Sequence, residues 1–172
     1  MSVTLDILAS YKAPRRVMRR LLAEGQREDR ALVILMVACG LIFVSQWPCL
    51  ARLAFLYPDV PLQARIGAAL FAWGCLAPIL MYCLAAISHI IALICGGKGS
   101  WFSARLALFW SLLCVAPLWL LHGLGAGFIG ASLGLSVLGF IIFVLTLAIW
   151  GASLYEAEQT QEAQTAPGDL AV

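Results

Sequence analysis

Residues 94–101, ICGGKGSW, place three glycines, a lysine and a serine close together, a composition that suggests a phosphate-binding loop. A loop of the GxxxxGK[ST] type needs a serine or threonine directly after the lysine, because that hydroxyl holds magnesium. Here Gly99 separates Lys98 from Ser100, and Ala92 occupies the position of the first glycine. We therefore predict no nucleotide site and no cofactor at this stretch.

The same stretch has the residue types of a turn between two helices. Gly96 and Gly97 can adopt left-handed backbone angles and stop one helix. Ser100 is suited to cap the next helix, which would begin near Trp101. Lys98 would then lie at the membrane surface, on the side that carries most of the positive charge. We predict a structural turn.

Three ionisable residues, His89, Arg105 and His122, lie inside or beside apolar runs, where such a group is a candidate functional site. A proton or cation pathway usually combines such a residue with a carboxylate. No aspartate or glutamate occurs between Asp59 and Glu156. Arg105 is close enough to the glycine turn to extend its charge to the membrane surface. The usual markers of a transporter are therefore missing.

Nucleophilic catalysis would need a serine and a histidine that face each other across helices. Ser111 with His89 or with His122 is the pair that the sequence offers. Serine in a membrane span more often bonds a backbone carbonyl or packs against a neighbouring helix. The six cysteines lie in or beside apolar runs, where cysteine behaves as a small hydrophobic residue. We predict that the protein is not an enzyme and holds no metal.

The composition indicates where such a chain can fold. The 172 residues are 63% hydrophobic and 12% charged, and the mean hydropathy is +0.96. An average soluble domain has about 25% charged and about 45–50% apolar residues. A water-soluble fold could not bury this much apolar surface, so the composition indicates an integral membrane protein. We expect a lipid bilayer as its surroundings and no nucleic-acid partner.

Four apolar stretches are long enough to cross the ~30 Å hydrocarbon core of a bilayer as helices. Three extend over residues 31–50, 101–121 and 132–153, and a longer one over 66–94 reads as one tilted, proline-kinked helix. Residues 124–129 leave a fifth crossing open. We predict an all-α fold, a polytopic transmembrane helical bundle of four spans, or five, with an N-terminal cytoplasmic amphipathic helix.

Residues 1–30 precede the first span and hold seven of the eleven basic residues. Within them, APRRVMRRLLAEGQ has apolar residues at helical spacing with arginines between, and Gly25 could end this helix. The helix either lies in the lipid headgroup layer or packs on the protein's own spans with solvated arginines. The predicted membrane-surface basic face consists of Arg15, Arg16, Arg19 and Arg20.

The chain divides into three parts: a cytoplasmic basic amphipathic segment (1–30), a transmembrane helical domain (31–155) and a disordered acidic tail (156–172). Positive charge is concentrated before the first span and at the glycine turn, whereas Arg52 and Arg65 border the connection between the first two spans. By the positive-inside tendency, the amino terminus is cytoplasmic. The tail would be cytoplasmic with four spans and external with five.

Small residues recur in GLGAGFIGASLGLSVLG, residues 123–139. Gly123 with Gly127, and Gly130 with Gly134, have the GxxxG spacing that lets two helices approach closely. Such a row serves packing inside the bundle, self-association, or docking on another membrane protein.

The segment GGKGSWFSARLALFWSLLCVAP resembles the central signature of the Yip domain family, which is named for interaction with Ypt/Rab GTPases. In that family a span ends in a Gly-Gly-x-Gly-Ser-aromatic turn, and the next span carries small or polar residues and a proline. The matching positions are Gly96, Gly97, Gly99, Ser100, Trp101, Ser111 and Pro117. The stretch YKAPRRVMRRLL also resembles the family's amino-terminal start, so that the resemblance covers about residues 8–155.

The resemblance implies a short bacterial-type member of the Yip family. Family members have five spans, one more than the four that are secure here, and the long cytoplasmic arm that contacts GTPases is absent. We therefore do not expect Rab binding. The function that we expect is that of a non-catalytic integral membrane protein of the bacterial inner membrane, which organises or binds other membrane components. Its partners would be further copies of the chain or other integral membrane proteins. The alternative is a small-solute transporter or channel subunit, since proline-bearing spans can build substrate sites.

Overall fold

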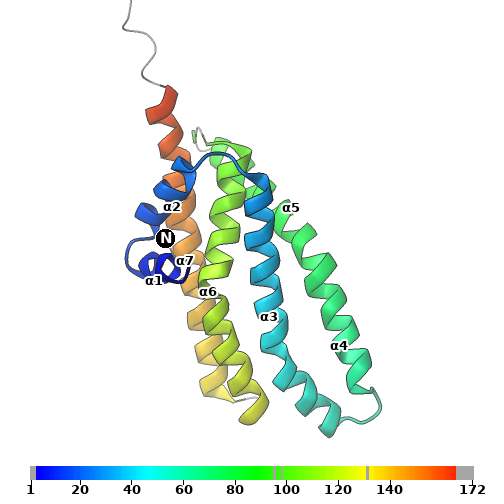
Figure 1. The fold of residues 1–172 in the computed structure, drawn as a ribbon. Helices are drawn as coiled ribbons and strands as arrows, with labels where there is room; N and C mark the ends of the chain where they lie inside the picture. The colour runs from blue at the N-terminus through cyan, green and yellow to red at the C-terminus, as the bar shows by residue number, and fades with distance from the viewer. Residues whose placement is uncertain (1–2, 95, 98, 131, 166–172) are drawn as a thin grey trace, which may run out of the picture.

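The computed structural model describes residues 3–94, 96–97, 99–130 and 132–165, with side chains up to residue 159. This part of the chain is all-helical and contains no strand, as predicted (Figure 1). The elements in chain order are α1 (Val3–Lys12), α2 (Pro14–Ala23), α3 (Glu28–Leu56), α4 (Leu62–Phe71), the π-helical segment η1 (Ala72–Leu76), α5 (Ala77–Ile94), α6 (Trp101–Phe128) and α7 (Leu133–Thr165).

Four helices in the described part of the chain are long and apolar enough to cross a membrane: α3, the continuous helix α4–η1–α5, α6 and α7. They form a helical bundle, so the predicted fold class is confirmed. Residues 124–129, which could have formed a fifth crossing, belong almost entirely to α6. The start of α3 and the end of α7 therefore lie at the same end of the bundle (Figure 1).

Three helices extend beyond their predicted ends, α6 by reaching Phe128 instead of residue 121. The first span was expected to end at residue 50, but α3 continues through Pro48 to Leu56. The tail was expected to be disordered from residue 156, but α7 continues to Thr165, so this prediction is wrong for residues 156–165. The cause lies in packing: Glu156 and Ala157 are buried against other helices. The rest of the predicted tail, residues 166–172, lies outside the described residues.

Helix α6 forms the centre of the bundle, in contact with α3, α5 and α7. In the most apolar 18-residue stretch of each span, the share of buried residues is 61% for α6, compared with 17% for α4–η1–α5 and 11% for α7. The aromatic residues Phe109 and Trp110 are almost fully enclosed. Most of the apolar surface of the second and fourth spans consequently faces outward, which suits helices surrounded by lipid.

Helices α3 and α6 approach closely because two positions on α6 are glycine. A Cβ atom at Gly123 would overlap the carbonyl oxygen of Ser45, and one at Gly127 would overlap Pro48. Gly134 on α7 has open space around it. Of the two GxxxG pairs, the first therefore serves packing inside the bundle.

The second span is continuous but not uniform, because it contains the π-helical turn η1. Pro78 lies two residues after this turn; it has no backbone N–H, and its ring would clash with the carbonyl four residues earlier in a regular helix. The widened turn relieves this clash, with the N–H of Ala77 donating to the carbonyl of Ala72.

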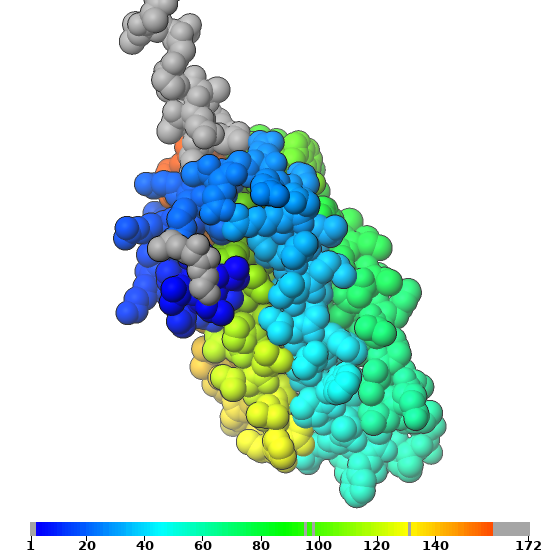
Figure 2. Space-filling view, viewed as in Figure 1, coloured from blue at the N-terminus to red at the C-terminus, as the bar shows by residue number. Residues whose placement is uncertain are grey.

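The N-terminal helices α1 and α2 pack on the flank of the bundle, beside α6 and α7 (Figures 1 and 2). Helix α2 was predicted; α1 was not. Val17, Met18 and Leu21 are buried in the core of the molecule. The apolar stripe of α2 therefore packs on the protein's own spans, and the alternative in which this stripe faces lipid does not hold. Gly25, with φ of +93°, follows the end of α2.

Candidate functional site

The glycine turn joins α5 to α6 with a hydrogen-bonding pattern typical of a helix end. Gly96 has φ of +88°, its N–H donates to the carbonyl of Leu93 at 3.0 Å, and the N–H of Gly97 donates to that of Ala92 at 2.8 Å. Ser100 then caps α6, because its Oγ accepts the N–H of Ser103 at 3.1 Å. Lys98 lies outside the described residues.

A carboxylate from the other end of the chain occupies this turn. The N–H of Gly99 donates to Oε2 of Glu158 at 2.6 Å. A Cβ atom at Gly97 or Gly99 would come within 2.5 or 2.6 Å of the Glu158 side chain, so a larger residue at either position would displace the carboxylate. The turn therefore binds an anion, but the anion belongs to α7.

His89 completes the cluster from α5. Its side chain is 2% exposed, its Nδ1 is 3.7 Å from Oε1 of Glu158, and its ring lies 4.5 Å from that of Trp101. Neither of these two polar atoms has a hydrogen-bond partner among the described residues. The arrangement joins the ends of three spans, and among the described residues it brings one histidine and one carboxylate together in a buried site.

The sequence did not reveal this pair, since Glu158 was assigned to a disordered tail. The sequence did offer one indication that Glu156 and Glu158 have different partners. If the tail continues as a helix, residues two apart point in nearly opposite directions. Glu156 and Glu158 do so, because Glu156 faces α2 and Glu158 faces the glycine turn.

The other ionisable residues near the spans have local partners. Arg105 pairs with Glu28, and its Nε donates to the carbonyl of Trp101 at 3.1 Å, at the same end as the glycine turn. His122 lies at the opposite end, where its Nε2 is 3.2 Å from the carbonyl oxygen of Leu135.

The serine chemistry considered from the sequence does not assemble. Ser111 donates to the carbonyl of Leu108 at 2.7 Å inside α6. Residues 130–134, GASLG, have the GxSxG spacing of a nucleophile elbow, but an elbow requires a strand before its serine. Here Ser132 lies between helices α6 and α7, and its Oγ accepts the N–H of Leu135 in the first turn of α7 at 3.3 Å. Pro117 lies in the interior of α6, which continues on both sides.

The described residues also form no metal site and no disulfide. Within the described residues, no group of three His, Cys, Asp or Glu side chains is placed to hold a metal ion. Five cysteines in that part of the chain are free thiols.

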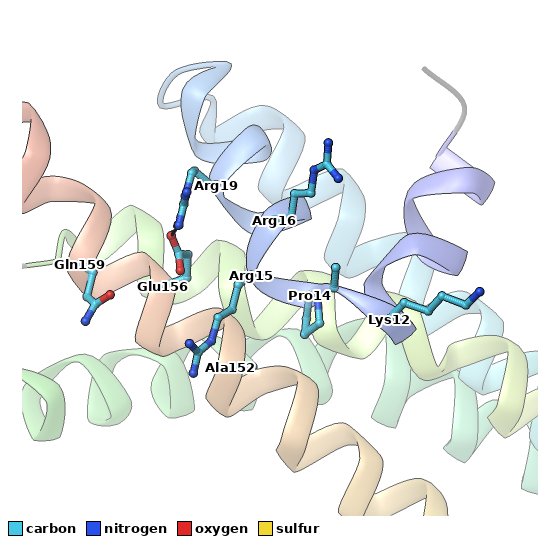
Figure 3. Close-up of a pocket in the computed structure, with 9 residues that line it drawn as sticks. Lys12, Pro14, Arg15, Arg16, Arg19, Ala152, Glu156 and Gln159 are labelled. Carbon is cyan, nitrogen blue, oxygen red and sulfur yellow. Dashed lines mark hydrogen bonds and ion pairs between the residues drawn. The ribbon is translucent and has the colours of Figure 1, made fainter.

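The four arginines of the predicted basic face do not share one environment. Arg19 pairs with Glu156 at 2.6 Å, and Arg20 pairs with Asp6 of α1. Arg15 lies over the ring of Tyr155, 4.7 Å from its centroid. Arg16 is exposed. Figure 3 shows Arg15 and Arg19 directed toward α7 and Arg16 extending away from it.

Helix α1 docks on the centre of the bundle through polar groups. Nε1 of Trp110 donates to Oγ of Ser10 at 3.0 Å, and the hydroxyl of Tyr11 donates to the carbonyl of Cys114 at 2.5 Å. Burial raises the pKa of the Tyr11 phenol above its ordinary value, and the neighbouring Cys114 thiol adds to the shift.

Comparison with known proteins finds no match: no protein-family model, no curated protein and no solved structure matches the chain.

Proposed function

We propose that this membrane protein acts without catalysis and organises or binds other membrane components. The observation that supports the proposal is the uneven burial of the spans. Helix α6 uses most of its surface inside the molecule, whereas α4–η1–α5 and α7 leave most of their apolar surface outside it. Phe71 on α4 and Phe140 on α7 are 66% and 67% exposed, and each belongs to a broad apolar face that a second membrane protein could cover.

Photo-cross-linking in native membranes tests this proposal. A benzoylphenylalanine would replace Phe71 or Phe140, and the control would replace Phe109, which is 0% exposed. We expect a discrete protein adduct, either with a second copy of the chain or with one defined partner, from at least one exposed position and not from the control. Lipid adducts alone at both exposed positions would contradict the proposal.

The orientation and the compartment are part of the same proposal. Six basic residues precede α3 and a seventh, Arg30, lies in its first turn, and Arg105 lies near the start of α6 at the same end of the bundle. We propose that this end faces the cytoplasm of a bacterium and that both termini lie there. A reporter fused after Val172 that is active only outside the cell would contradict this orientation.

The Yip-like assignment also remains a proposal. It is supported by the same residues as before, now seen to have physical roles: Gly96 ends α5, Gly97 and Gly99 leave room for Glu158, and Ser100 caps α6.

One observation favours the alternative, transport. The π-helical turn η1 borders an apolar cavity of ≈ 160 Å³ lined by residues of α3, α4 and η1, among them Gly40 and Gly74. Irregular turns inside spans occur at substrate sites. Flux measured in proteoliposomes, for the wild type and for His89→Ala, separates the two functions. Our proposal expects no flux from either protein, and flux that depends on His89 would replace it with the alternative.

A further inference from the structure

An open cavity of ≈ 670 Å³ lies between α2 and α7 (Figure 3). Its α7 wall is formed by Ala152, Glu156 and Gln159. These residues mark the end of the apolar run Leu133–Tyr155, which is roughly 33 Å long at about 1.5 Å per residue and so matches a hydrocarbon core of ~30 Å. The cavity therefore opens at the boundary between hydrocarbon and headgroups.

The other wall of the cavity is cationic, with Lys12, Arg15, Arg16 and Arg19 along it. Arg19 is balanced by Glu156 at 2.6 Å. Arg15 stacks on Tyr155, which positions the guanidinium group without neutralising it. Among the described residues, neither Lys12 nor Arg16 has a carboxylate partner. The cavity consequently keeps an excess of positive charge.

Two contacts join the walls of the cavity. The Arg19–Glu156 ion pair and the Arg15–Tyr155 stack tie α2 to α7 on one side of it. At the start of α2, Ala13 supplies no side-chain hydrogen bond to the first N–H groups, so the positive end of the helix dipole adds to the field. A ligand would meet this arrangement already formed.

Beside the cavity, α1 presents apolar side chains outward. Val3, Leu5 and Leu8 are 50%, 60% and 64% exposed, whereas Asp6 and Ser10 of the same helix are buried. This is the reverse of a helix packed against a protein in water, but it suits a helix whose outer face meets acyl chains. Apolar and cationic surfaces thus lie next to each other, as the two parts of a phospholipid require.

We propose that this cavity binds the phosphate headgroup of an anionic phospholipid, with Arg15 directed at the phosphate, with Lys12 and Arg16 adding positive charge along the cavity wall, and with the acyl chains along α1. Arginine is suited to phosphate because its N–H groups form paired, charge-assisted hydrogen bonds. Basic pockets at the cytoplasmic ends of spans bind anionic headgroups in this way. The inference rests on the proposed function, since it names one membrane component that the protein binds.

The test uses the full chain in nanodiscs of phosphatidylcholine mixed with anionic phosphatidylglycerol, with retained lipid identified by native mass spectrometry. The variant is Arg15→Gln/Arg16→Gln. The matched control is Arg27→Gln, an exposed arginine outside the cavity whose only ion pair among the described residues is a 3.4 Å contact with Asp29. A further arm adds soluble glycerol phosphate to separate a free phosphate ligand from a lipid. Thermal unfolding shows that each variant is folded, and Lys12→Gln replaces the double variant if that protein does not fold.

We expect the wild type to retain phosphatidylglycerol preferentially, and the double variant to lose that preference roughly 10- to 30-fold. Arg27→Gln should keep the preference, and glycerol phosphate should not displace the lipid. The inference is overturned by any of four results: no preference in the wild type, an unchanged preference in the double variant, an equal loss in Arg27→Gln, or displacement by glycerol phosphate. Cross-links at Phe71 or Phe140 do not depend on this cavity, so the proposed function could survive such a failure.

Discussion

Glu156 and Glu158 show how two residues in one turn of a helix can have separate tasks. Glu156 holds the arginine Arg19 of α2, and Glu158 holds the backbone of the glycine turn beside His89. Both carboxylates are largely buried, with side chains 6% and 11% exposed, but Arg19 is 69% exposed, so water screens the ion pair of Glu156 more than the contacts of Glu158. The end of α7 is thereby fixed to two different parts of the protein.

The first prediction concerns the Glu158 carboxylate. Glu158→Ala removes the acceptor of the Gly99 N–H, and a hydrogen bond to a charged group contributes about 1.5–3 kcal/mol. We expect faster amide hydrogen exchange at Gly99 and a loss of stability of this order in detergent unfolding. Gln159→Ala, at the exposed neighbouring position, should change neither quantity. Unaltered exchange at Gly99 in Glu158→Ala would show that the carboxylate does not hold the turn.

The second prediction concerns pH and Tyr11. The folded pKa of its phenol is raised, so the stability that it contributes is complete below the ordinary value of 10.0 and is lost as pH rises through the folded value. Docking of α1 should therefore weaken only at strongly alkaline pH. Tyr11→Phe removes the hydrogen bond to Cys114, should cost about 1 kcal/mol, and should abolish this alkaline step.

A distance between spin labels on α1 and α6, followed from neutral to alkaline pH, measures docking for both proteins. If α1 undocks at the same pH in Tyr11→Phe as in the wild type, the phenol is not the responsible group.

At the scale of elements, what could be predicted depended on the kind of signal. The spans were predictable because apolar runs of this length have few alternatives, and Pro14 and Gly25 marked the limits of α2. Helix α1 was not, because its polar residues Asp6 and Ser10 face inward and its leucines outward, the opposite of the pattern used to recognise amphipathic helices. The His89–Glu158 pair depends on a contact between positions far apart in the sequence, which spacing alone does not encode.

The third prediction concerns the contact between α3 and α6. Gly123→Ala and Gly127→Ala should each destabilise the protein by about 1–3 kcal/mol, because the new methyl group overlaps Ser45 or Pro48. Gly134→Ala, where nothing lies near the new Cβ atom, should be neutral or slightly stabilising, since alanine favours helix more than glycine does. Thermal unfolding in one detergent compares all three variants. Equal stability of the three would mean that α3 and α6 are not in close contact.

At the scale of the whole molecule, the exposed residues are distributed as expected for a protein that is surrounded by lipid. Apolar side chains such as Phe55, Phe71 and Phe140 face outward, while serines and a histidine are buried. The N-terminal helices take part in this arrangement, because α1 contacts α6 near Trp110 and Cys114, roughly 14–20 Å along the helix from Trp101 at about 1.5 Å per residue. They lie on the flank of the bundle, where α2 and α7 form the cationic cavity, and we infer that α1, which was predicted to be cytoplasmic, lies there at membrane depth.

The position of α1 therefore tests the account most directly. A nitroxide label at Leu8, in the protein reconstituted into liposomes, reports collisions with oxygen, which is enriched in hydrocarbon, and with a water-soluble nickel complex. We predict high accessibility to oxygen and low accessibility to nickel, because Leu8 is 64% exposed and would face acyl chains. High nickel accessibility at Leu8 would place α1 in water and would contradict both the membrane-embedded flank and the lipid site beside it.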